Sequence, residues 1–170
     1  MKTGISIALA ALALALFAVP DAYGKSGPDL DVRIFGSSFI TSSQDDGTPT
    51  PATEASTSLQ SGIAKGSGSA IFSAQTVIEQ PLPDAHCPAE LPFGNDLTTS
   101  VVLTYNDGSI LSATTGTDSF FCSDGVLFVA EFVGTVTGGD GRFEGATGTW
   151  EGTAQVDGTR VTGNLIVDLD

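Results

Sequence analysis

Apolar and polar residues alternate along most of the chain beyond residue 30, between breaks that contain Gly, Asp or Asn. The clearest stretch is residues 160–169, where Val161, Leu165 and Val167 occupy one set of alternate positions and polar residues most of the other. This period of two is typical of a β-strand with one buried face, and no window beyond the N-terminal apolar run has the three-and-four spacing of an amphipathic helix. The pattern therefore predicts an all-β fold.

Turn sequences join several of these segments into hairpins. Asp157-Gly158 separates residues 147–156 from the last strand, and an Asn-Asp-Gly turn at 106–108 follows another alternating segment. Such residues tolerate the positive φ angles of tight hairpins. The predicted strands are residues 32–41, 63–79, 101–105, 110–115, 119–122, 126–137, 147–156 and 160–169.

Seven or eight strands, with small residues beside Trp150, predict a small antiparallel up-and-down β-barrel of about eight strands. A two-sheet β-sandwich is the alternative. Residues 42–62 are rich in Ser, Thr, Pro and acids and lack apolar periodicity, so they are predicted to form a mobile loop. The proline-rich residues 81–95 are predicted to form a long connection.

The N-terminus has the three-part layout of a secretory signal peptide. Lys2 precedes an apolar run from Ile5 to Val19, and small residues lie just before a cleavage point after Gly24. The run is shorter than the roughly 20 residues of a membrane-spanning helix. We therefore expect residues 1–24 to be removed and residues 25–170 to form a single domain that is secreted, periplasmic or extracellular, with no membrane span after cleavage.

The net charge and the cysteine content limit the classes of partner and cofactor that we expect for this protein. The formal net charge of −14 disfavours nucleic acid and anionic lipid surfaces. The only two cysteines, Cys87 and Cys122, would be exported to an oxidising compartment, which predicts a disulfide between them. Their spacing matches no zinc or haem pattern, and His86 is the only histidine. We expect no metal and no cofactor.

Residues 138–148 read Gly-Gly-Asp-Gly-Arg-Phe-Glu-Gly-Ala-Thr-Gly. This run resembles the glycine-rich motif of the allene-oxide-cyclase-like barrels, the superfamily that includes dirigent proteins, with Asp140 in place of the usual Thr. The resemblance implies an up-and-down barrel, often in a homo-oligomer, with a cavity for a small apolar or phenolic molecule. The catalytic residues of neither branch match positions in this chain, so no catalytic role is carried over.

The strand at 126–137 is apolar on both faces and supplies most candidate site residues. Phe128 and Phe132 share one face, and with Trp150 they are the expected ligand-binding residues inside the barrel. Trp150 could instead simply fill the core. Glu131 lies on the other face, where a buried carboxylate could act as a general acid or base. The alternative for Glu131 is a carboxylate at the barrel rim or a subunit interface.

Three functions fit these features. The first is a secreted barrel that binds a small apolar ligand or a protein partner without catalysis. The second is a cofactor-free isomerase or cyclase with Glu131 as its acid or base. The third is a structural or adhesive extracellular module, because the second apolar face of residues 126–137 should be covered by a loop or a subunit partner. An open apolar cavity would favour the first, a buried carboxylate in it the second, and a filled core the third.

Overall fold

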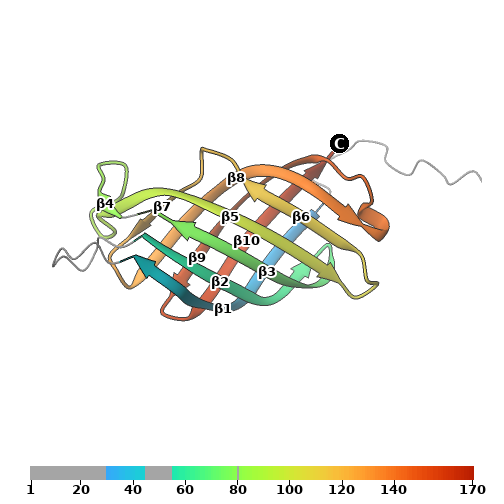
Figure 1. The fold of residues 1–170 in the computed structure, drawn as a ribbon, viewed down its shortest axis with the longest axis horizontal. Coiled ribbons are helices and arrows are strands. Elements are labelled where there is room, and N and C mark those ends of the chain that lie inside the picture. The colour runs from blue at the N-terminus through green and yellow to red at the C-terminus, as the bar shows by residue number, and fades with distance from the viewer. Residues whose placement is uncertain (1–29, 45–54, 80) are drawn as a thin grey trace, which may run out of the picture.

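The computed structural model describes residues 30–44, 55–79 and 81–170, which form a closed eight-stranded antiparallel barrel with two additional strands (Figure 1). The predicted all-β barrel is confirmed. The predicted signal peptide, and residues 45–54 of the predicted loop, lie outside the described residues. Within the described part of the chain, no helix has the length and apolarity needed to cross a membrane.

The barrel closes because the first and last described strands of the chain pair with each other. Around it the strands follow the order β3, β2, β1, β10, β9, β8, β6, β5, and β3 then pairs with β5. The last pairing runs from Ala70 opposite Tyr105 to Ile78 opposite Leu97. The strands are β1 (Leu30–Gln44), β2 (Ala55–Gly66), β3 (Gly68–Ile78), β4 (Leu82–Pro83), β5 (Phe93–Tyr105), β6 (Ile110–Thr115), β7 (Phe120–Ser123), β8 (Leu127–Asp140), β9 (Gly148–Asp157) and β10 (Arg160–Leu169).

β6 and β7 occupy one position in the barrel, as two halves of an interrupted strand. Both pair with β5 on one side and β8 on the other. Ser119 bridges the interruption, because its hydroxyl donates to the carbonyl of Val133 at 3.0 Å and accepts from the Val133 amide at 3.1 Å. Its own carbonyl accepts from the Leu97 amide at 3.1 Å. A side chain therefore supplies part of the ladder where the strand breaks.

The end of the barrel near the β5–β6 hairpin is filled by core side chains. A single 3-10 turn, η1 (Gly141–Phe143), lies there between β8 and β9 within the glycine-rich run (Figure 1). The Arg142 guanidinium lies 4.3 Å from the Tyr105 ring centroid and 4.8 Å from that of Phe143, and it pairs with Asp107 at 3.4 Å. Burial raises the pKa of the Tyr105 hydroxyl. The core side chains at this end are Leu30, Val32, Ala64, Ala70, Leu103, Tyr105, Leu111, Phe143, Val167 and Leu169.

The predicted mobile loop at residues 42–62 is wrong at both ends, since residues 42–44 still belong to β1. Residues 55–62 belong to β2, which pairs with β1 and β3 and turns into β3 at Ser67. Gly66 and Gly68, at φ of 140° and 117°, allow this tight turn. The single predicted strand at 63–79 therefore covers the end of β2 and the whole of β3. The alternation misled because β2 turns Ser58 and Gln60 inward and leaves Leu59 exposed.

Candidate functional site

The half of the barrel interior away from η1 contains a cavity of about 130 Å³. Its lining reaches Ile40, Ile78 and Phe128 at the strand ends and Gly158 in the β9–β10 turn. Ile40 is 71% exposed, so the cavity opens to solvent at this end. An engineered apolar cavity of about 150 Å³ takes up benzene. The volume therefore suits a molecule built on one ring or a short apolar chain.

One wall of the cavity, from β7, β8 and β9, is aromatic. The rings of Phe132 and Trp150 stack with centroids 5.8 Å apart and planes 17° apart, and those of Phe121 and Phe128 lie 6.0 Å apart. Trp150 is only 3% exposed, and its indole nitrogen donates to the carbonyl of Thr114 at 2.9 Å. Its polar atom is thus satisfied within the protein, and the ring contributes apolar surface to the wall.

The opposite wall, from β2, β3 and β5, carries a chain of buried neutral polar side chains. Ser58, Thr76 and Thr99 form one register row across the three strands, and Gln60 lies two residues from Ser58 on the same face. Gln60 Nε2 donates to Ser58 Oγ at 2.6 Å, and Thr76 donates to Gln60 Oε1 at 3.2 Å. The hydroxyls of Thr76 and Thr99 are 2.9 Å apart. We name these four residues the polar chain.

The expected ligand-binding residues Phe128, Phe132 and Trp150 all line this one cavity. The structure does not bring Glu131 there. Glu131 is exposed and lies between Phe120 and Thr153 of the neighbouring strands, because β8 alternates and Phe132 is the residue that it turns inward. Glu131 therefore lies outside the cavity and is not buried, and a role for it as an acid or base stays a prediction.

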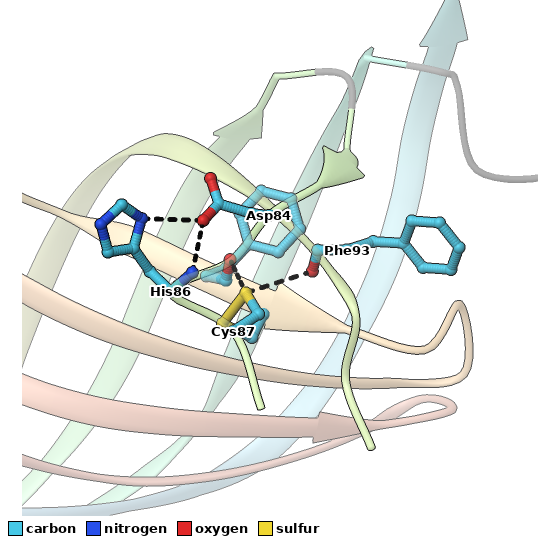
Figure 2. The surroundings of a disulfide bond; sticks show 6 residues. Asp84, His86, Cys87 and Phe93 are labelled. Atoms are coloured by element: carbon cyan, nitrogen blue, oxygen red, sulfur yellow. Dashed lines mark hydrogen bonds and ion pairs between the residues drawn. A yellow bond between two sulfur atoms is a disulfide. The ribbon is translucent and has the colours of Figure 1, made fainter. Parts of the chain in front are cut away.

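The predicted disulfide between Cys87 and Cys122 is confirmed, and it ties the loop before β5 to β7 (Figure 2). A Cβ on Gly94 would overlap the Cys87 sulfur, so the bridge packs on bare backbone. The same sulfur lies 3.6 Å from the Phe93 carbonyl oxygen. Since Phe121 precedes Cys122 and turns into the cavity, the bridge anchors part of the aromatic wall.

His86 belongs to a surface turn beside the disulfide. Its ring Nδ1 lies 2.8 Å from Asp84 Oδ1, and its backbone amide donates to the same oxygen at 2.7 Å (Figure 2). This backbone bond is the main reason that the pKa of Asp84 is lowered. The His86 side chain is 89% exposed, and no group of three or more metal-ligating side chains occurs among the described residues.

No described segment of this chain covers the apolar residues on the outer surface of the barrel. Val133 on β8 is 46% exposed, so a covering subunit stays a prediction. A second apolar surface, which the sequence reasoning missed, lies on the outward face of β1, β2 and β3. Its exposed members are Phe35, Phe39, Leu59, Ile63, Ile71 and Val77.

Comparisons of the chain with protein-family models, with curated proteins and with solved structures find no match. The resemblance to the allene-oxide-cyclase-like barrels therefore stays a hypothesis carried by residues 138–148.

Proposed function

We propose that this protein binds a small, largely apolar molecule in the barrel cavity without transforming it. The observation that carries the proposal is a cavity of about 130 Å³ that is open at one end and has a wall of stacked aromatic rings. Concave, mostly apolar sites with a few placed polar groups are the usual form of small-molecule binding sites. The volume is below that of the pockets that hold drug-sized ligands, about 300–1,000 Å³, so the ligand is small.

The chemistry of the lining favours binding over acid–base catalysis. Every described side chain that lines the cavity is apolar or carries a neutral hydroxyl or amide, and Glu131 lies outside it. General acid–base catalysis needs a group that takes up or releases a proton at the working pH. The polar chain offers hydrogen bonds instead. The disulfide is compatible with a periplasmic or extracellular location, which we propose for the protein.

Filling the cavity tests the proposal. Ala154→Leu adds three carbon atoms to the cavity wall, whereas Thr153→Leu places the same side chain on the outward face of the same strand. Calorimetric titration with toluene and thermal melting at rising toluene concentration would be compared for the wild-type protein and both variants. We expect saturable binding and a raised Tm for the wild-type protein and for Thr153→Leu, and loss of both for Ala154→Leu.

Two outcomes would contradict the proposal. One is the absence of saturable binding for one-ring compounds and short-chain apolar compounds to the wild-type protein. The other is equal binding of toluene by Ala154→Leu and the wild-type protein, which would place the ligand outside the cavity.

A further inference from the structure

We infer that the cavity selects an uncharged ligand with one hydrogen-bond-accepting group, which faces Ser58 and Gln60 while the apolar body lies on the aromatic wall. This inference rests on the proposed function and specifies the class of ligand. The chemistry that fits is an alcohol, ketone, ether or amide on a single ring or short chain.

The hydrogens of the polar chain all point toward Ser58. Thr76 gives its only hydroxyl hydrogen to Gln60 Oε1, so in the 2.9 Å contact with Thr99 it is the acceptor and Thr99 is the donor. Gln60 in turn gives one amide hydrogen to Ser58 Oγ. The backbone amide of Thr99 donates to Thr115 Oγ1 at 2.8 Å, and this bond fixes the position of Thr99. The polar chain is therefore an ordered series of hydrogen bonds, in which each donor points toward the next residue and the last acceptor, Ser58, lines the cavity.

Two polar hydrogens at the Ser58 end of the polar chain are not used in its hydrogen bonds. The hydroxyl hydrogen of Ser58 and the second amide hydrogen of Gln60 have no acceptor among the described residues. Both side chains are buried and both line the cavity. A buried donor without an acceptor is costly, so a ligand that brings an acceptor gains over a ligand of the same shape that brings none.

Charge at the cavity and its mouth favours an uncharged ligand. A carboxylate or ammonium would lose its hydration in a cavity whose described lining contains no opposite charge. Exposed acids also surround the mouth: Asp124 lies in the β7–β8 turn, Asp157 begins the β9–β10 turn, and Glu79 follows β3. Arg160 faces Asp157 across its turn and offsets one of these charges. The remaining field repels anions that approach the opening.

The test uses four probes on the same ring: benzyl alcohol, its near-isostere ethylbenzene, benzoate and benzylamine. Calorimetric affinities would be measured for the wild-type protein, for Gln60→Met, and for Gln75→Met, which makes the same change on the outward face of β3. Ser58→Ala/Gln60→Met is a second variant, which removes both donors; Ser58→Ala alone would free the Gln60 amide hydrogen that Ser58 accepts. The quantity of interest is the ratio of the affinity for benzyl alcohol to that for ethylbenzene, because this ratio cancels the general hydrophobic contribution.

We expect Gln60→Met and Ser58→Ala/Gln60→Met to lower this ratio about 3- to 10-fold, the value of one or two neutral hydrogen bonds, and Gln75→Met to leave it unchanged. We also expect benzoate and benzylamine to bind more weakly than benzyl alcohol. The inference is overturned if the ratio stays constant in both cavity variants, or if either charged probe binds as tightly as the alcohol. If ethylbenzene still binds in those cases, the proposed function stands. If no probe binds the wild-type protein, both fail.

Discussion

The indole of Trp150 on β9 passes over the bare backbone of Gly134 on β8 and donates to the Thr114 carbonyl of β6, 2.9 Å away. A Cβ on Gly134 would overlap both the indole nitrogen and that carbonyl. The side chain therefore spans three strands, and it can do so only where the middle strand has no side chain.

Gly134→Ala should destabilise the barrel, because the added methyl group displaces either the indole or the carbonyl that it bonds. Overpacking of this kind typically costs about 1–3 kcal/mol. Urea denaturation measures the loss. Gly116→Ala is the matched control, since its Cβ would meet only the Val133 carbonyl oxygen at 3.7 Å, an ordinary contact. Equal midpoints for the two variants would refute the steric account.

Substitution of Trp150 separates its hydrogen bond from its bulk. Trp150→Phe keeps a ring beside Phe132 but leaves the Thr114 carbonyl without its donor, a change worth about 1–3 kcal/mol. Trp150→Ala removes the ring as well and should cost about 3–5 kcal/mol. Because Trp150 is the only tryptophan, its emission can be followed directly and should be blue-shifted and resistant to iodide quenching. Red-shifted, readily quenched emission would contradict its burial.

Ser119→Ala should open the ladder where β6 and β7 are interrupted. The variant loses both bonds to Val133 and leaves the Val133 amide without its acceptor, while the Val133 carbonyl keeps its bond from the Gly116 amide at 2.8 Å. The expected cost is about 1–3 kcal/mol. Hydrogen exchange should accelerate at the Val133 amide before it does elsewhere in β8. Ser100→Ala, at an exposed position of β5, serves as the control and should change neither quantity. Unchanged exchange at Val133 in Ser119→Ala would refute the bridging role.

The sequence predicts best where burial and alternation agree. β10 was predicted at the residues where it occurs, and Trp150, Ala154 and Val156 of β9 face inward as the pattern indicated. β2 was missed because the usual rule is inverted there: Ser58 and Gln60 point into the cavity while Leu59 points to solvent. The large apolar residues of such a strand face solvent, so the usual rule that the apolar face is the buried one does not apply to it.

The site could be predicted only in part for a related reason. Phe128 and Phe132 were assigned to the cavity because they share a strand face with other apolar residues, but the opposite face of that strand is apolar too. Period-two alternation cannot say which of two apolar faces turns inward, so the exposure of Glu131 and the burial of Phe132 could not be predicted from the sequence. The polar chain depends on contacts between β2, β3 and β5, which no local pattern reveals.

The carboxylate of Asp124 should make the β7–β8 turn sensitive to acid. It accepts from the amides of Val126 and Leu127, both at 2.8 Å, and the Leu127 bond is the main cause that lowers the pKa of Asp124 below its ordinary value of 3.8. A carboxyl group with a lowered folded-state pKa stabilises the folded protein above its unfolded-state pKa. That contribution is lost as pH falls through the folded-state pKa.

Measurement of the Asp124 carboxyl by NMR titration should therefore give a midpoint below 3.8. The amide chemical shifts of Val126 and Leu127 should change over the same pH range, because their hydrogen bonds to Asp124 are lost when it is protonated. A midpoint for Asp124 at or above 3.8 would contradict the assigned hydrogen bonds.

Removal of the disulfide should weaken the protein and loosen one part of the cavity wall without abolishing the barrel. The two cysteines are 35 positions apart, and closing a loop of that length restricts the unfolded chain by roughly 4 kcal/mol in the chain-entropy model. The β3–β5 and β1–β10 pairings that close the barrel do not pass through the bridge. A domain with about 5–15 kcal/mol of stability can therefore remain folded.

The local effect should be larger at β7, because this four-residue strand is held on its outer side by Cys122 and presents Phe121 to the cavity. In Cys87→Ala/Cys122→Ala, amide exchange at Phe121 should accelerate far more than exchange at Val161 and Leu165 of β10. Toluene binding should weaken as the aromatic wall loses order. Dithiothreitol should lower the urea midpoint of the wild-type protein to that of the double variant and leave the variant unchanged. Uniform acceleration of exchange across β7 and β10 would instead show that the bridge stabilises the barrel as a whole.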